Sequence, residues 1–270
     1  MELPNSLAHE SGCVSDLEVY RRHPLLEEQW SAFRAGRASL QASANWYAAR
    51  LAESSGPVCE LACGYGRLLL PAAVAGREVY GTDAVPERIA AARRLFVVQG
   101  DLARFEVLRL PAVPHLERCM GGRHFADVVL ACNALGYVLT ESAKLKLFKG
   151  VHAILRPGGR FLFDHGRGSG VLRVLGRWPG LRGSVGTSGH HMRSQLRWDR
   201  REHCVRERFV EGIHGDFVAA STDRFRFTTV RRTLALVREA GFELEQACGS
   251  FGGEPLRPWS RRLVAVARRV

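Results

Sequence analysis

Residues 58–67 read VCELACGYGR, a short apolar run, one acid and then glycines at alternate positions. Gly64 and Gly66 lack Cβ atoms, so the backbone at these positions can lie close to a bound molecule. The spacing is not the GxGxxG of a nicotinamide site, and no GK[ST] follows as in a Walker loop. The stretch therefore predicts a ligand-binding turn that is not built for a pyrophosphate.

The elements around this turn alternate between strands and helices. Short apolar runs that follow Gly or Pro breaks predict buried strands, and the longer segments between them predict helices. This alternation is typical of parallel βαβ units in a doubly wound sheet, which binds ligands at the carboxyl ends of its strands. The predicted strands are residues 56–62, 77–83, 95–101, 124–134 and 156–164, and the predicted helices between them are 66–76, 85–96 and 140–155.

Five of these segments together resemble the motifs of class I S-adenosylmethionine-dependent methyltransferases. ELACGYGR is similar to motif I, with Glu60 as the acid and Ala62, Gly64 and Gly66 where the family has three glycines. The other four are VYGTDAVPERIAAAR, VVQGDLARF, ADVVLACNALGYVL and LRPGGRFLFD. The resemblance covers about residues 45–165 and resumes near 234–255 and 261–269. It implies an α/β Rossmann-like methyltransferase fold, a doubly wound and mostly parallel seven-stranded sheet, with S-adenosyl-L-methionine as cofactor.

The resemblance also implies which residues hold this cofactor. Asp83, at the end of the second strand, would accept hydrogen bonds from both ribose hydroxyls, as a carboxylate with two oxygens can. Asp101 would accept the adenine amino group and the Leu102 amide would meet the ring, while Asn133 would line the methionine end or cap a turn. The complete predicted cofactor set is Glu60, Ala62, Gly64, Tyr65, Gly66, Asp83, Asp101, Leu102 and Asn133.

Methyl transfer from a sulfonium is an in-line displacement, so the enzyme mainly supplies proximity and alignment. An amine acceptor must be neutral, and an alcohol must lose its proton to a base. The candidate catalytic residues near the strand ends are His165, Tyr137 and Asp164. Tyr65 and Tyr137 could also face the sulfonium, because a cation suits an aromatic face. No metal site is expected, since the seven cysteines form no CxxC pair.

An insertion separates the fifth strand from the last helix. HHMRSQLRWD, EHCVRERFVEG and DFVAASTDRFRFTT read as short strands, which predicts an antiparallel β flap inserted after strand five. We expect residues 1–45 to form a helical lid, residues 46–164 and 229–270 the cofactor-binding core, and residues 165–228 the substrate cover. Such covers resemble those of methyltransferases that act on glycine or on the amino groups of nucleotide-linked sugars, which implies an amine nitrogen as acceptor.

Charge on the insertion predicts the kind of acceptor. Residues 156–208 contain twelve arginines against four acids, and a basic surface steers anions. We therefore expect a small anionic acceptor, with His23, Arg167, Arg193 and Arg197 as substrate contacts.

Several alternatives stay open at this stage. The net charge of +12 and pI of about 10.0 also fit RNA binding. However, the [NDS]PP[YF] tetrad of base-amino methyltransferases is replaced by CNAL, and no appended nucleic-acid-binding motif follows. A small-molecule C- or O-methyltransferase, a non-catalytic partner subunit and a homodimer are further possibilities. The chain shows no amino-terminal signal and no apolar run of ~18 residues, and its odd cysteine count favours reduced thiols, so we expect a cytoplasmic protein without a membrane partner.

Overall fold

The computed structural model describes residues 37–113, 116, 124–166, 181–187, 190–199, 201, 204–213, 216–260 and 262–270. Residues 1–36 of the predicted helical lid lie outside these residues. No helix among the described residues is both long and apolar enough to cross a membrane.

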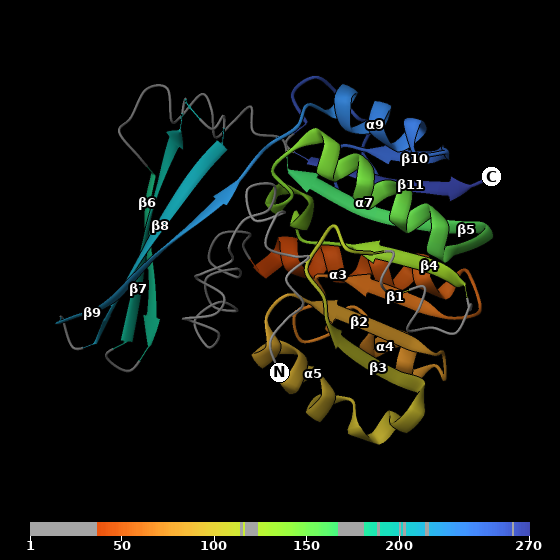
Figure 1. Cartoon of the computed structure of the whole chain (residues 1–270), viewed down its shortest axis with the longest axis horizontal. Coiled ribbons are helices and arrows are strands. Elements are labelled where there is room, and N and C mark those ends of the chain that lie inside the picture. The colour runs from red at the N-terminus through yellow and green to blue at the C-terminus, as the bar shows by residue number, and fades with distance from the viewer. Residues whose placement is uncertain are drawn as a thin grey trace.

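A seven-stranded sheet forms the centre of the protein, in the order β10-β11-β5-β4-β1-β2-β3 (Figure 1). The five strands from β3 to β5 run parallel. Strand β11 pairs antiparallel with β5, and β10 pairs antiparallel with β11, so β10 again runs in the direction of β5. The seven strands are β1 (Val58–Leu61), β2 (Val79–Asp83), β3 (Ala103–Val107), β4 (Phe125–Leu130), β5 (Leu155–Gly166), β10 (Phe242–Cys248) and β11 (Arg262–Arg269). The predicted α/β fold, doubly wound and mostly parallel, is confirmed.

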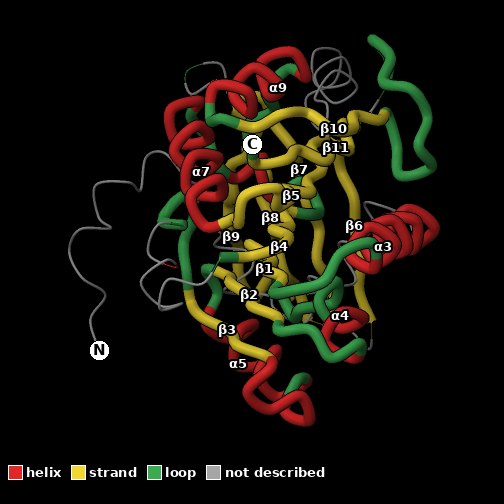
Figure 2. Tube along the Cα trace, turned by 90° about the vertical axis from the view of Figure 1, so that its right-hand side faces the viewer, coloured by secondary structure: helices red, strands yellow, loops and turns green. Residues whose placement is uncertain are grey.

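Helices cover both faces of this sheet (Figure 2). Buried side chains of α3, α4 and α5 pack on one face, and those of α7 and α9 pack on the other. Helix α7 begins where the sequence predicts it, because the Thr140 side chain accepts a hydrogen bond from the Ala143 amide at 3.2 Å. The helices are α3 (Arg37–Ala52), α4 (Leu70–Val74), α5 (Pro86–Leu95), α7 (Glu141–Ile154) and α9 (Val230–Glu239).

The third strand lies further along the chain than the sequence analysis places it. Residues expected to form that strand instead form the 3-10 helix η2 (Val97–Leu102), which is broken at Gly100 by a φ of +53°. Val97 and Val98 are 73% and 83% exposed, so this apolar pair does not have the burial of a central strand. Strand β3 follows directly and buries Phe105 instead.

A second, four-stranded antiparallel sheet follows β5, as predicted for the insertion. It lies on the side toward which the carboxyl ends of the parallel strands point (Figure 1). Three of its strands coincide with the predicted segments, and the first was not predicted. The strands are β6 (Leu181–Thr187), β7 (His190–Asp199), β8 (Cys204–Ile213) and β9 (Asp216–Phe225).

Candidate active site

The glycine-rich turn directly follows β1 and bonds to the end of β2. The Gly64 amide donates to Asp83 Oδ2 at 2.9 Å, and the Cys63 amide donates to the Thr82 carbonyl at 2.8 Å. Gly64 has a φ of +58°, and a Cβ placed on it would meet no atom within 4 Å. A Cβ on Gly66 would lie 2.9 Å from Phe96 Cε2. Gly64 thus faces open space, whereas Gly66 is needed for packing in the core.

Asp83 ends β2 and is 3% exposed. Besides the Gly64 amide, its carboxylate accepts the Val85 amide at 3.0 Å, and Arg88 lies 3.6 Å away. Burial raises the pKa of Asp83, and the backbone amides work against that rise. Each carboxylate oxygen can accept more than one hydrogen bond, so two hydroxyl groups of a ribose still fit this acceptor.

Glu60 lies in β1 beside the turn, and its Oε2 is buried with no hydrogen-bond partner among the described residues. Burial raises the pKa of Glu60 to about 8, with Arg67 opposing the rise and Asp83 adding to it. A buried carboxyl group without a partner is unfavourable unless a ligand supplies one. The ammonium group of a methionine moiety could supply this partner, because it is positively charged and carries hydrogen-bond donors.

The loop after β4 has an unusual backbone that Asp164 holds in place. Cys132 and Asn133 have φ values of +56° and +60°, a strained conformation for residues other than glycine. Asp164 accepts their amides at 2.8 and 3.1 Å and also accepts the Tyr47 hydroxyl at 3.0 Å and Arg262 at 2.5 Å. Each oxygen of Asp164 thus accepts two donors, and the carboxylate orients the loop rather than offering itself as a base.

His165 is also engaged at both ring nitrogens. Its Nε2 accepts the Thr228 amide at 3.1 Å, so Nδ1 carries the proton and donates to Asn133 Oδ1 at 3.0 Å. Asn133 Oδ1 also accepts the Gly166 amide at 2.8 Å. Burial, with the charge of Lys144 nearby, lowers the pKa of His165 to about 3. The ring therefore stays neutral and positions Asn133, and it has no free lone pair with which to take a proton.

Aromatic side chains gather at this same end of the sheet. Tyr137 ends the 3-10 helix η3 (Ala134–Tyr137), and its ring centroid lies 6.4 Å from that of Phe225 at the end of β9. The ring centroid of Phe227 lies 5.3 Å from that of Phe225 and 6.4 Å from that of His165. Tyr65 is half-buried in the turn after β1. Tyr137 thus lies with Asp164 and His165 at the carboxyl ends of β4 and β5, and its catalytic role stays a prediction.

Asp101 and Leu102 require a correction. Both precede β3 and lie at its amino end, whereas Asp83 pairs in register with Val107 at the carboxyl end. A five-residue strand spans ~16 Å, so these two residues lie at the opposite edge of the sheet from the turn. The structure does not bring them to the cofactor residues.

The predicted substrate contacts are placed only in part. His23 and Arg167 lie outside the described residues, and Arg193 lies in β7 with its side chain outside them. Arg197 is exposed in β7, where it stands opposite Arg206 of β8. Arg206 pairs with Asp199 at 2.6 Å, and Arg197 has no ion-pair partner among the described residues.

Sequence reasoning missed four residues that build the site. Tyr47 and Arg262 hold Asp164, while Lys144 and Thr228 bind one another at 2.6 Å beside His165. Tyr47 and Arg262 come from α3 and β11, far from the motifs in sequence, and nothing in their own neighbourhoods marks them. Lys144 offered one signal, because it is one of only three lysines and all three lie in α7.

Comparisons with known proteins relate the chain to methyltransferases. Residues 58–159 match the family model described as "Methyltransferase domain". The chain is 25% identical over 237 residues to "Putative methyltransferase YqeM" of Bacillus subtilis, covering 83% of this chain and 88% of that protein.

Solved structures share the fold. An S-adenosylmethionine-dependent methyltransferase from Clostridium acetobutylicum has a TM-score of 0.77 at 13% identity, covering 92% of this chain and 99% of that one. The sugar N-methyltransferase KedS8 from Streptoalloteichus has a TM-score of 0.64 at 18% identity, and the match covers 89% of this chain and 93% of that one.

Residues 58–159 therefore form a methyltransferase domain, and the chain has the Rossmann-like fold of solved S-adenosylmethionine-dependent methyltransferases. The chain is an S-adenosylmethionine-dependent methyltransferase, and S-adenosyl-L-methionine is its cofactor.

Proposed function

We propose that the protein methylates an amine nitrogen of a small anionic acceptor, such as an amino sugar carrying a phosphate or carboxylate. The observation that carries this proposal is the four-stranded sheet inserted directly after β5, beside the carboxyl ends of the parallel strands. Similar folds include proteins named as an amino pentose methyltransferase and a sugar N-methyltransferase. The basic residues of the insertion supply the charge that an anionic acceptor needs.

Glu60, Gly64 and Asp83 fit the cofactor. Gly64 leaves room for it, and Asp83 offers acceptors to a ribose. Glu60 offers an ammonium group a buried oxygen that none of the described residues bonds. When bound, S-adenosyl-L-methionine supplies an electrophilic methyl group on a positively charged sulfur. Asn133, held by His165 and the Gly166 amide, lines the methionine end in this proposal.

The residues around the acceptor orient it and exclude water rather than remove a proton by a strong base. Asp164 and His165 are fully engaged, as described above, and we assign Tyr137, whose ring lies near that of Phe225, to orienting the acceptor. A neutral amine would take the methyl group as the carbon–sulfur bond breaks, with S-adenosylhomocysteine as the leaving group, and would then lose its proton to solvent. This fits nitrogen as the acceptor atom better than a hydroxyl oxygen, which would need a base.

Arg197 is the described basic residue that we assign to the anionic group of the acceptor. Arg197 is exposed and has no ion-pair partner in the described part of the chain, and its planar guanidinium can hold a carboxylate or phosphate through two hydrogen bonds. We assign Arg167, Arg193 and His23 to the same role. We also propose domain limits of 46–164 and 229–270 for the core, with 1–45 and 165–228 as covers.

Product analysis tests this function. Purified protein is incubated with S-adenosyl-L-methionine and a set of amino sugar nucleotides, their hydroxyl-only counterparts and short RNAs. We expect release of S-adenosylhomocysteine and a gain of one methyl group on nitrogen, only with the amino sugar nucleotides. Methylation of a neutral apolar compound, of a hydroxyl-only sugar or of RNA would overturn the proposal. RNA is the second candidate, because the net charge of +12 favours it.

A further inference from the structure

The chain returns from the four-stranded sheet to the core through residues 225–228, the return segment. Its Arg226 amide donates to the Gly136 carbonyl of η3 at 2.8 Å, and the Arg226 guanidinium reaches the Leu139 carbonyl at 3.3 Å. The Thr228 amide donates to His165 of β5 at 3.1 Å. The return segment is thus bonded at the carboxyl ends of both β4 and β5, where methyl transfer must occur.

Lys144 joins this segment to α7. The Lys144 side chain is 1% exposed, and its Nζ donates to Thr228 Oγ1 at 2.6 Å and to the Arg226 carbonyl at 3.3 Å. Burial lowers the pKa of Lys144 to about 7, and the charge of Arg226 adds to that effect. A buried amine is unfavourable unless its hydrogen bonds compensate, so its contacts with the return segment explain why an amine is tolerated here.

These bonds form a continuous chain to the cofactor end of the site. Lys144 holds Thr228, the Thr228 amide fixes His165 as its Nδ1–H tautomer, and His165 then donates to Asn133. Without the Thr228 amide, His165 Nε2 would lose its donor, and the ring could change tautomer or rotate.

We propose that Lys144 and Thr228 are positioning residues for methyl transfer, which hold the return segment against His165 and thereby fix the His165–Asn133 pair. This deepens the function proposed above, but its structural part does not depend on the identity of the acceptor.

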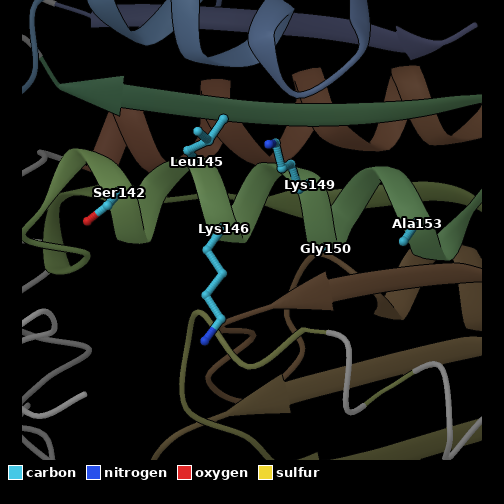
Figure 3. Close-up of a pocket in the computed structure, with 6 residues that line it drawn as sticks. All are labelled: Ser142, Leu145, Lys146, Lys149, Gly150 and Ala153. Carbon is cyan, nitrogen blue, oxygen red and sulfur yellow. The ribbon is translucent and has the colours of Figure 1, made fainter. Parts of the chain in front are cut away.

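Each test variant has a matched control. The control for Lys144 is another lysine of α7, and the control for Thr228→Val is a second substitution at Thr228. Lys144→Met removes the amine and keeps the length of the side chain. Lys146→Met is the control, because Lys146 lines a shallow groove of about 420 Å³ on the outer side of α7, together with Ser142, Leu145, Lys149, Gly150 and Ala153 (Figure 3). Thr228→Val removes the hydroxyl and keeps a similar side-chain volume. Thr228→Ser is its control, because serine keeps the hydroxyl.

Two measurements need no acceptor. Hydrogen exchange of the Arg226 and Thr228 amides should accelerate at least about tenfold in Lys144→Met and Thr228→Val, and stay at the wild-type rate in Lys146→Met and Thr228→Ser. The ring nitrogens of His165, observed by ¹⁵N NMR, should report a single Nδ1–H tautomer in the wild type and a mixture in Lys144→Met. Wild-type exchange and a single tautomer in both Lys144→Met and Thr228→Val would overturn the inference.

Steady-state kinetics with the amino sugar nucleotides separate this inference from the proposed function. We expect Thr228→Val to lower kcat/KM about tenfold, Thr228→Ser to restore it, and the affinity for S-adenosylhomocysteine to stay within twofold in both. Failure of the wild type to methylate any amino sugar would sink the proposed function, while exchange and NMR would still decide the role of Lys144. A Thr228→Val variant with unchanged kcat/KM would reject the positioning role in catalysis.

Discussion

Single residues in the turn after β1 have separate tasks, although the sequence presents them as one motif. Ala62 replaces the first glycine of the family pattern and still adopts a φ of +55°, so the turn keeps its shape at the cost of strain. Gly64 faces open space, and Gly66 packs against Phe96. Glycine is therefore needed at these two positions for different reasons.

This division predicts opposite phenotypes for two alanine variants. Gly64→Ala should remain folded, losing about 1 kcal/mol to its positive φ, but should bind S-adenosylhomocysteine at least about tenfold more weakly, because its methyl group enters the cofactor space. Gly66→Ala should lose ~1–3 kcal/mol of stability beyond the loss in Gly64→Ala, because its methyl group would clash with the ring of Phe96. Calorimetry and chemical denaturation measure the two effects. Wild-type affinity in Gly64→Ala would show that the turn does not face the cofactor.

Glu60 predicts a pH dependence of both stability and cofactor binding. Its pKa in the folded protein is raised to about 8 by burial, above that of the unfolded chain. Between about pH 5 and about pH 8, the folded state therefore binds one more proton than the unfolded state. The free energy of unfolding should fall as the pH rises through this range. The ammonium of the cofactor favours the ionised form, so its affinity should rise over the same range.

The matched variant is Glu60→Gln, which keeps the shape but cannot ionise. It should flatten both pH profiles, measured by denaturation and by calorimetry with S-adenosylhomocysteine between about pH 5 and about pH 8. Asp83 is also buried with a raised pKa, so any slope that remains in Glu60→Gln would belong to that group. The assignment to Glu60 is wrong if the variant keeps the full wild-type slope.

At the scale of the elements, the sequence predicts what local patterns determine. The short apolar runs locate β1, β2, β4 and β5, and Thr140 marks the start of α7. The third strand was misplaced because VVQGD has the apolar residues of a strand and an acid at its end. The structure buries Phe105 instead and leaves Val97 and Val98 exposed, so tertiary packing decides between two similar local patterns.

The site beyond the motif could not be predicted for a related reason. Asp164 ends up bound by Tyr47 from α3 and Arg262 from β11, which are 117 and 98 residues away in the chain. His165 Nε2 accepts the Thr228 amide, which comes from the return segment 63 residues further along the chain. Local sequence marks both as titratable residues at a strand end, but only the assembled sheet shows that their lone pairs are occupied.

At the scale of the whole molecule, basic residues are concentrated in one segment of the sequence. Residues 156–208 contain twelve arginines against four acids, and this segment includes β5, β6 and β7. A small acceptor with one or two negative charges requires few contacts, whereas RNA requires many. The salt dependence of activity distinguishes these cases, because each neutralised phosphate of a nucleic acid adds to the slope.

We predict a shallow dependence on salt. Between about 50 and about 200 mM salt, kcat/KM for the anionic acceptor should fall by less than about tenfold, whereas an RNA substrate with 6–10 phosphate contacts would lose roughly 10³–10⁵ in affinity. Arg197→Ala should weaken acceptor binding by about 1.5–3 kcal/mol and reduce the salt slope, with cofactor affinity unchanged. Arg94→Ala is the control, because Arg94 is an exposed arginine in the last turn of α5, in the helical layer outside the four-stranded sheet. Equal kinetics for wild type and Arg197→Ala would mean that this arginine is a solvated surface charge, and a steep slope would favour RNA as the substrate.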